Sequence, residues 1–271
     1  MKGLLLYNEA ETEKNRFFID SIIRSASDNG IDMKLCTSAA DFDYDEDFAI
    51  NRSRSFLAAR ELEEHGIRVF NDSFLSETAN DKWNTYEYLH NKLPMAETLP
   101  AEKNCPFPYP AVVKPRHGHG GRNVFLVNSD SEYDRALDII SETVIYDFTG
   151  SPVCEEAIVQ PCLDTGRDLR VYIIGNEIIA SVMRTSETDF RSNYSLGGKA
   201  KLFSPDLKIT EYVLQTAELI APDFAAFDFI FSGDSCFLNE IEDAAGYRML
   251  YSNTQDINIP DKMIQHILAN L

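Results

Sequence analysis

The chain has 271 residues, a formal net charge of −19 at pH 7, 44% hydrophobic residues and 25% charged residues. This composition is ordinary for a globular protein and excludes extensive disorder. The length suits two or three closely packed lobes around one cleft. The negative charge argues against a nucleic-acid partner, because phosphate binding depends on clustered Lys and Arg.

The cysteines and the N-terminus give no sign of export. The five cysteines are widely spaced and form no C-x-x-C motif, so neither a disulfide framework nor a thiolate zinc site is indicated. The start MKGLLLYNEA has a short apolar run, and no stretch approaches the ~20 apolar residues of a membrane-spanning helix. We therefore expect a soluble cytoplasmic protein without a membrane partner.

The first part of the chain alternates short apolar runs with helical patterns. Strands are expected at 3–7, within FAINRSRS, and at 31–35 and 67–70, with helices near 14–27 and 55–65. Gly30 and Gly66 provide helix stop signals. Such alternation is typical of a parallel sheet, so residues 1–75 are predicted to form a small α/β lobe.

The remaining residues, 76–271, are predicted to form one larger domain with two lobes. A helix at 80–91 and the proline-bounded segment LPMAETLP precede a central lobe over about 95–160, with strands AVVKP, NVFLV and AIVQPCL and a helix near 131–141. The C-terminal lobe, 161–271, contains two hairpins that turn at Gly175-Asn176 and Gly233-Asp234. Helices are expected at about 206–220 and 261–271. The fold class is α/β (α+β), with an antiparallel C-terminal sheet.

Three acidic residues in the second hairpin are candidate metal ligands. Asp228 lies in AFDFIF, while Glu240 and Glu242 are two apart in FLNEIED and point to the same face of the sheet. Ionised carboxylates that converge repel one another unless a cation joins them, and hard oxygen ligands favour Mg²⁺. The alternative is a solvent-facing hairpin edge with unrelated acids.

A lysine and a glycine-rich loop form the second candidate site. In VVKPRHGHGGRNVFL, Lys114 ends an apolar strand, and Gly118, Gly120 and Gly121 follow it. Glycines allow backbone N–H groups to approach phosphate oxygens, and the lysine adds a positive charge. The segment is not a Walker loop. It could also be a mobile hairpin, and the H-x-H pair His117 and His119 has too few neighbouring ligands to favour zinc.

Two basic segments, GRDLR and DFRSN, flank the first hairpin. Asp168 and Arg170 share one strand face, and Arg191 and Asn193 are also two apart. Arginine forks match carboxylate and phosphate groups, so these residues indicate an anionic ligand near the three acids. A structural salt-bridge network is the alternative.

Taken in order, these motifs resemble the ATP-grasp superfamily, and most closely its RimK-like branch of glutamate and amino-acid ligases. The resemblance covers roughly residues 50 to 250, and the ordered combination is specific although each motif is weak. The residues and motifs that carry it are Lys82, VVKP with its glycine loop, VQPCL, GRDLRVYIIG, DFRSN with Gly197-Gly198, Asp228 and NEIED.

The resemblance implies an ATP-grasp fold that holds ATP between two lobes. It places Lys82, Lys114 and the glycine loop on the phosphates, Gln160 at the nucleotide, and the backbone of Pro161 and Cys162 beside adenine, with Asp168 in the same site. Arg191, Ser192 and Asn193 would meet the phosphates or an acyl phosphate, and Arg170 a substrate carboxylate, so Arg191, Asn193 and Arg170 are the implied catalytic residues. Asp228, Glu240 and Glu242 would hold one or two Mg²⁺, with Mn²⁺ as an alternative.

The chain departs from the family pattern at two positions. Glu242 stands where the family generally has Asn, and Pro161 where it usually has Glu. The implied activity is an ADP-forming ligase that joins a carboxylate substrate to an amine, on an amino acid, peptide or peptide-bearing protein. A phosphotransferase on the same fold and a nucleotide-binding partner protein with impaired chemistry are the alternatives. The sequence carries no signal of oligomeric state.

Overall fold

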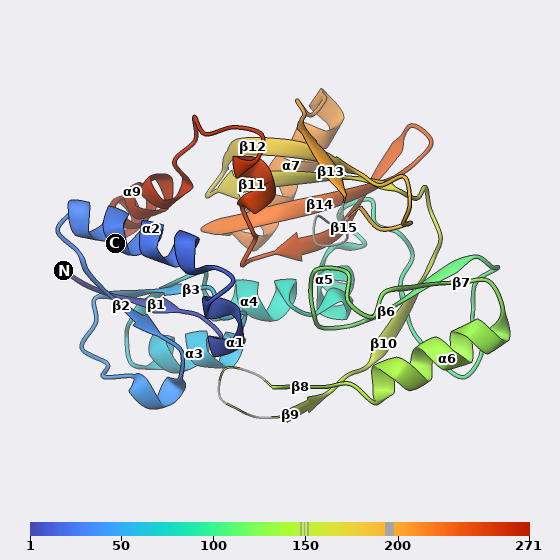
Figure 1. Cartoon of the computed structure of the whole chain (residues 1–271), viewed down its shortest axis with the longest axis horizontal. Coiled ribbons are helices and arrows are strands. Elements are labelled where there is room, and N and C mark those ends of the chain that lie inside the picture. The colour runs from blue at the N-terminus through green and yellow to red at the C-terminus, as the bar shows by residue number, and fades with distance from the viewer. Residues whose placement is uncertain (147, 149, 151, 193–197) are drawn as a thin grey trace.

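The structure is a computed structural model that describes residues 1–146, 148, 150, 152–192 and 198–271. Three main sheets meet near the middle of the molecule (Figure 1). This mixed arrangement of parallel and antiparallel sheets confirms the predicted fold class. Within the described residues, no helix combines the length and the apolar character needed to cross a membrane.

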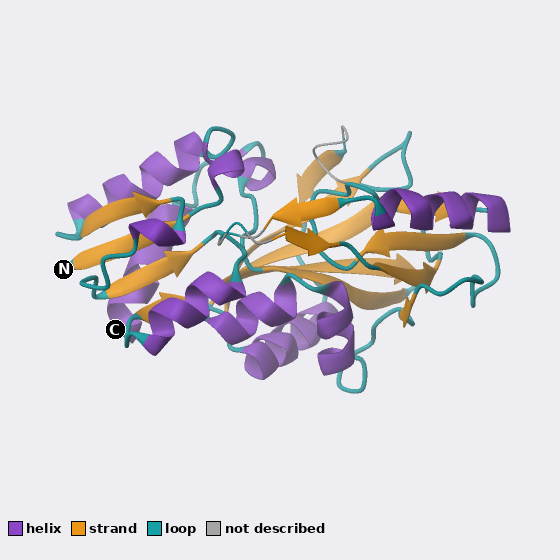
Figure 2. Cartoon of the chain, turned by 90° about the horizontal axis from the view of Figure 1, so that it is seen from below, coloured by secondary structure: helices purple, strands orange, loops and turns teal. Residues whose placement is uncertain are grey.

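The first sheet is parallel, with the order β2-β1-β3-β4. Helices cover both of its faces (Figure 2). On one face Leu5 packs with the helix at Arg16–Asp28, and on the other Leu4 and Leu6 pack with the helix at Phe56–Glu64. The expected strands and helices are present, with ends shifted by one or two residues. The elements are β1 Lys2–Leu6, α1 Glu9–Thr12, α2 Arg16–Asp28, β2 Asp32–Cys36, a 3₁₀ turn at Ala39–Asp41, β3 Phe48–Asn51, α3 Phe56–Glu64 and β4 Arg68–Phe70.

The second sheet is antiparallel, with the order β5-β10-β6-β7, and one helix packs on it. Its elements are β5 Leu99–Pro100, β6 Ala111–Pro115, β7 Phe125–Val127, α6 Asp130–Ser141 and β10 Ala157–Pro161. Two helices, α4 Ser73–Ala79 and α5 Lys82–Leu89, lead into it, and a ribbon of β8 Val144–Tyr146 and β9 Pro152–Cys154 lies outside it. Neither α4 nor this ribbon was expected from the sequence.

The third sheet contains both predicted hairpins in the order β13-β12-β11-β14-β15. One face packs on α7 through alternate apolar residues, among them Val171, Phe227 and Phe229. The opposite face carries Asp168, Arg170 and Asp228 toward the centre of the molecule. The elements are β11 Arg167–Ile174, β12 Glu177–Thr185, β13 Lys199–Leu202, α7 Leu207–Ile220, β14 Phe224–Ser232, β15 Ser235–Glu242, α8 Arg248–Tyr251 and α9 Ile259–Asn270.

The C-terminal helix joins the first and third sheets. Met263, Ile264 and Ile267 of α9 lie in the same buried cluster as Ile19 of α2 and Tyr172 of β11. Each fully buried apolar side chain of this kind stabilises the fold by about 1.5–3 kcal/mol. The shared core therefore fixes the first sheet against the acidic face of the third.

Candidate nucleotide and metal site

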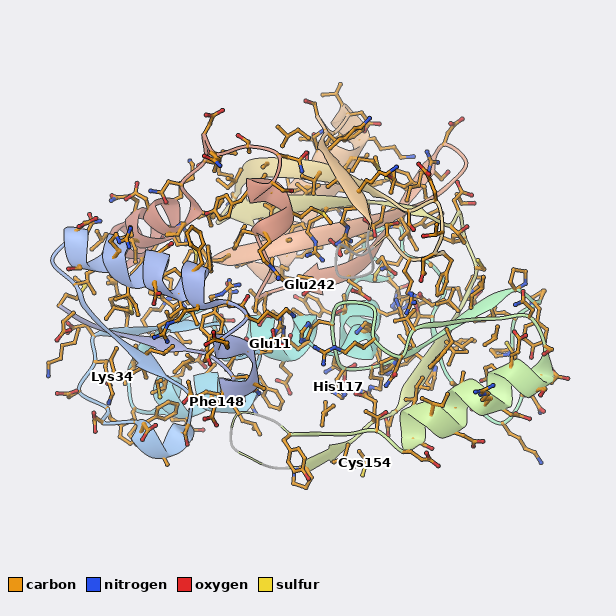
Figure 3. All side chains as sticks on the ribbon, viewed as in Figure 1. Glu11, Lys34, His117, Phe148, Cys154 and Glu242 are labelled. Carbon is orange, nitrogen blue, oxygen red and sulfur yellow. The ribbon has the colours of Figure 1, made fainter. Side chains whose placement is uncertain are left out.

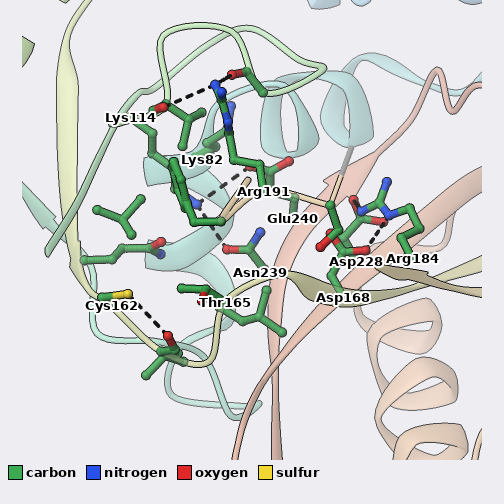
Figure 4. A pocket seen from close by; sticks show the side chains of 18 of the residues that line it. Lys82, Lys114, Cys162, Thr165, Asp168, Arg184, Arg191, Asp228, Asn239 and Glu240 are labelled. Atoms are coloured by element: carbon green, nitrogen blue, oxygen red, sulfur yellow. Dashed lines mark hydrogen bonds and ion pairs between the residues drawn. The ribbon is translucent and has the colours of Figure 1, made fainter. Parts of the chain in front are cut away.

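A pocket between the second and third sheets contains most of the predicted nucleotide residues (Figure 4). It has an empty volume of about 910 Å³, which includes space open to solvent. The predicted residues that line it are Lys82, Lys114, Gly118, Gly121, Gln160, Pro161, Cys162, Asp168, Arg191, Ser192, Asp228 and Glu240.

Two lysines enter this pocket from neighbouring elements. Lys114 is buried on β6, and its Nζ lies 3.1 Å from Oδ1 of Asn239 and 3.7 Å from Oε1 of Glu240. Lys82 begins α5 and donates from Nζ to the carbonyl oxygen of Gly118 at 2.9 Å. Burial lowers the pKa of Lys114 to about 8, although Glu240 opposes the shift. A bound polyphosphate would favour the protonated amine further.

The glycine loop, residues 116–124, forms one wall of the pocket. Gly118, Gly120 and Gly121 have φ values of +92°, +73° and +76°, a left-handed conformation that residues with a Cβ rarely adopt. Arg191 reaches this loop from the third sheet's side and donates from Nη1 to the carbonyl oxygen of Gly121 at 2.8 Å. Asp189 accepts from the same guanidinium at 2.9 and 2.8 Å. Arg191 therefore connects the two walls.

The three predicted metal residues converge on the inner face of the third sheet. Asp228, Glu240 and Glu242 each offer a carboxylate oxygen within 4.8 Å of the others. Asp228 on β14 lies directly opposite Glu240 on β15, and Glu242 follows two residues later. Three hard oxygen donors at this spacing form a set that suits a divalent cation such as Mg²⁺.

Two arginines hold these acids together. Arg170 donates from Nε to Oδ1 of Asp228 at 2.7 Å and from Nη2 to Oδ2 of Asp228 at 2.6 Å and to Glu242 at 3.0 Å. Arg184 donates to Oδ2 of Asp228 at 2.7 Å. Burial alone would raise the pKa of Asp228, but both arginines outweigh it and hold the pKa at about 2. Asp228 is therefore ionised at neutral pH.

Arg184 and Asn239 also line the first pocket, and neither was identified from the sequence. Arg184 is 4% exposed and lies opposite Asp168 across the β11–β12 hairpin, where its Nε donates to the Asp168 carboxylate. Burial nevertheless raises the pKa of Asp168, since Arg184 offsets only part of that effect. Asn239 borders Glu240 in NEIED, so the motif itself was a signal for it. Nothing local marked Arg184.

A second pocket adjoins the carboxylates on the side of the first sheet, with an empty volume of about 830 Å³. Gly120, Arg170 and Glu242, three of the predicted residues, line this pocket rather than the first. Glu11 of α1 also lines it, and Figure 3 shows Glu11 and Glu242 near the middle of the molecule. His119 and Arg184 line both pockets, which therefore meet beside the acidic cluster.

Three further expectations from the sequence have separate outcomes. Asn193 lies outside the described residues. Pro161 has no N–H group, and the N–H of Cys162 donates to the carbonyl oxygen of Pro110 at 3.3 Å. His117 is held by Glu155, whose Oε1 lies 3.0 Å from its Nδ1.

Comparisons with known proteins show the family to which this chain belongs. A family model for the RimK-like ATP-grasp domain matches residues 90–267. The uncharacterized protein MG011 of Mycoplasma genitalium is 30% identical over 99% of this chain and 93% of its own length. The alpha-aminoadipate–LysW ligase LysX of Saccharolobus solfataricus is 26% identical over 84% of this chain and 84% of its own length.

A solved structure supports the same assignment at the level of the fold. The D-alanine–D-alanine ligase of Bacillus anthracis, in complex with ATP, matches with a TM-score of 0.76 at 14% identity, covering 99% of this chain and 96% of the ligase. The motifs that resemble the family therefore occur in a chain that matches both the domain model of that family and the fold of an ATP-grasp ligase. The chain belongs to the RimK-like ATP-grasp family, whose fold binds ATP.

Proposed function

We propose that this protein is an ATP- and Mg²⁺-dependent ligase that joins a carboxylate to an amine through an acyl phosphate. The observation that carries the proposal is the position of Asp228, Glu240 and Glu242, which lie where two pockets meet. One pocket has the lysines and backbone of a phosphate site, and the other adjoins the same carboxylates and would take a second substrate. The ligase relative from Saccharolobus solfataricus supports the reaction class.

In this proposal the first pocket binds ATP. Lys82, Lys114 and the glycine loop take the phosphates, and the segment from Gln160 to Leu163 takes adenine. Pro161 lacks an N–H group, and the N–H group of Cys162 already donates to Pro110. In this proposal the backbone donor to the adenine base is therefore Leu163. We further propose the lobe boundaries predicted from the sequence, 1–75 and 76–271, with 95–160 and 161–271 on either side of the nucleotide.

The acidic cluster fits one or two Mg²⁺, and Mn²⁺ has the same preference for oxygen ligands. When bound, the cation neutralises charge on the triphosphate and on the transferring phosphoryl group. Asp228, Glu240 and Glu242 would hold it. Arg170 and Arg184 already compensate these acids, so the cation competes with two guanidinium groups for Asp228.

The reaction then has two balanced steps. An oxygen of the substrate carboxylate attacks the γ-phosphorus, the bond to the β-phosphate oxygen breaks, and ADP leaves. The amine next attacks the acyl carbon, phosphate leaves, and the amine nitrogen loses a proton to solvent. Arg170, at the border of the second pocket, orients the substrate carboxylate, while Arg191 holds the glycine loop over the phosphates and limits access of water.

The direct test follows oxygen atoms. The protein, with Mg²⁺ and ATP, is supplied with ¹⁸O-carboxylate amino acids or short peptides together with a panel of amines. We expect ADP, an amide product, and one ¹⁸O atom in the released phosphate. Glu240→Gln should abolish this transfer, whereas Glu218→Gln, at an exposed position on α7, should leave it unchanged.

The other outcomes are equally informative. A stable phosphorylated product that forms without any amine would identify a phosphotransferase. ATP binding without turnover on the whole panel would indicate a nucleotide-binding partner protein. Either result contradicts the ligase proposal.

A further inference from the structure

The second pocket is basic although the protein is strongly acidic. The chain carries a net charge of −19, yet the described lining of this pocket has more basic than acidic side chains. The acidic ones are Glu11 and Glu242; the basic ones are Lys14, Arg52, Arg54, Arg170, Arg184 and Arg248. A concentration of positive charge in an acidic protein favours an anionic ligand at that place.

Two of these arginines, Arg52 and Arg54, have no carboxylate in direct contact among the described residues. Arg170 and Arg184 pair with Asp228, but Arg52 and Arg54 form no salt bridge with any carboxylate in the described part of the chain. Arg52 donates only to neutral groups, with Nε 2.7 Å from the hydroxyl of Tyr7 and Nη2 2.7 Å from a backbone carbonyl oxygen. Glu11, Glu242 and Asp243 act on Arg54 only from beyond salt-bridge distance, so both guanidinium groups keep hydrogen-bonding capacity for an anionic ligand.

Both guanidinium groups also keep an unused buried donor. Arg52 is 5% exposed, and its Nη1 has no hydrogen-bond partner among the described residues. The Nε of Arg54 is likewise buried without a partner, while its Nη2 donates to the carbonyl oxygen of Ala244 at 3.2 Å. A buried donor without an acceptor costs about 1–3 kcal/mol. An anion in the pocket offers the acceptors that these groups lack.

The loop that carries the two arginines is fixed in an uncommon conformation. Arg54 has φ +64°, which few non-glycine residues adopt and which costs about 1 kcal/mol or more. The side chain of Asn51 accepts from the N–H and hydroxyl of Ser53 at 3.1 and 2.7 Å, and Ser55 caps α3. The loop follows β3, at the carboxyl end of a parallel strand, where open α/β sheets commonly bind ligands.

We propose that Arg52 and Arg54 form a subsite for a substrate carboxylate that takes no part in the reaction. The ligand of the second pocket is then a dicarboxylate, such as an acidic amino acid or the acidic end of a peptide. This inference rests on the proposed function, because it places one carboxylate at the arginine pair and the reacting one near Arg170. Arginine forks bind carboxylates in two-point contacts, so an uncharged amide in the same position is rejected.

The test compares dicarboxylates with their monoamides. Binding of succinate, glutarate and adipate, and of the three monoamides, is measured by calorimetry on the full chain loaded with the ATP analogue AMPPNP and Mg²⁺. We expect at least one dicarboxylate to bind tenfold or more tightly than its monoamide. Arg54→Gln should reduce that ratio to about one, and Arg60→Gln, at an exposed position on α3, should preserve it.

Two controls keep the outcome unambiguous. If urea unfolding shows that Arg54→Gln is not folded, Arg54→Lys is used in its place. We expect its dicarboxylate-to-monoamide affinity ratio to be severalfold below that of the wild type, because the forked guanidinium is lost while the positive charge remains. A ratio near one for every pair in the wild type, or an unchanged ratio in the folded Arg54 variant, overturns the subsite. AMPPNP binding is measured in the same samples, so failure of the nucleotide site is recognised separately.

Discussion

Replacement of Glu242 by asparagine tests whether the third carboxylate belongs to the metal site. In the structure, Oε1 of Glu242 accepts from Nη2 of Arg170 at 3.0 Å, and Arg170 keeps two further hydrogen bonds to Asp228. Loss of one hydrogen bond to a charged group costs about 1.5–3 kcal/mol.

The same substitution removes repulsion. The oxygens of Glu242 and Asp228 lie within 4.8 Å, where two like charges repel by about 3 kcal/mol at an effective dielectric constant of about 20. The two contributions nearly cancel, so we expect the free energy of unfolding to change by no more than about 1 kcal/mol. A bound cation, in contrast, loses one attractive charge. Because Arg170 already neutralises part of the charge of Glu242, the loss is smaller than for an unpaired carboxylate, and Mg²⁺ affinity should fall about tenfold, or 1.4 kcal/mol.

Urea unfolding measures the first quantity, and the Mg²⁺ concentration that half-saturates AMPPNP binding measures the second. Glu218→Asn, the same change at an exposed position on α7, is the matched control and should alter neither. A loss of more than about 3 kcal/mol in unfolding free energy would mean that the ion pair with Arg170 dominates. An unchanged Mg²⁺ requirement would refute the placement of Glu242 in the metal site.

Three other substitutions test the remaining parts of the site. Lys114→Met should weaken AMPPNP binding about 100-fold. Burial lowers the pKa of Lys114 to about 8, and the charged amine binds phosphate, so the affinity of the wild type should also fall as pH rises through 8. An equal decline in the variant would contradict this assignment. Arg184→Met leaves the carboxylates of Asp168 and Asp228 buried without this partner. Urea unfolding should show that the free energy of unfolding falls by about 3–5 kcal/mol. A decrease below about 1 kcal/mol would show that these ion pairs contribute little to stability. Arg191→Ala removes the donor to the glycine loop, so amide hydrogen exchange over residues 116–124 should accelerate. The free energy of unfolding should change by less than about 1 kcal/mol. Unchanged exchange would mean that Arg191 does not hold the loop.

The elements that could be predicted from the sequence are those with local signals. Strand alternation, glycine stops and two-residue turns were sufficient for the parallel sheet and for both hairpins. Helix α4 lacks such a signal, because it buries Ser76 and Thr78 rather than a regular apolar stripe. Ser76 is buried because its hydroxyl donates to Asp243 at 3.0 Å, a partner 167 residues away.

The candidate site likewise contains residues with a local sequence signal and residues without one. Lys82, Lys114 and the glycine loop belong to recognisable local motifs, and the structure brings them into one pocket. Arg52 and Arg54 stand in a segment, FAINRSRS, that reads only as a strand followed by polar residues. Their importance depends on what the fold places opposite them, namely the segment that follows β15.

The convergence of the three acids depends on a feature that no pattern in the sequence announces. From the turn at Gly233-Asp234 the β14–β15 register begins regularly, with Phe229 opposite Leu238. Continued without interruption, this register would place Asp228 opposite Asn239. Because directly opposite residues point to the same face, Asp228 would then point away from Glu240 and Glu242.

A bulge between Asp228 and Phe229 shifts the register by one residue and brings Asp228 opposite Glu240. The β11–β12 hairpin has a similar shift between Tyr172 and Ile173, and only beyond it does Asp168 lie opposite Arg184. Bulges re-aim side chains near active sites, and here each one turns a residue of the cluster to the required face. The candidate residues were therefore chosen from spacing and resemblance, but the physical reason that they lie together is a pair of one-residue irregularities in otherwise regular hairpins.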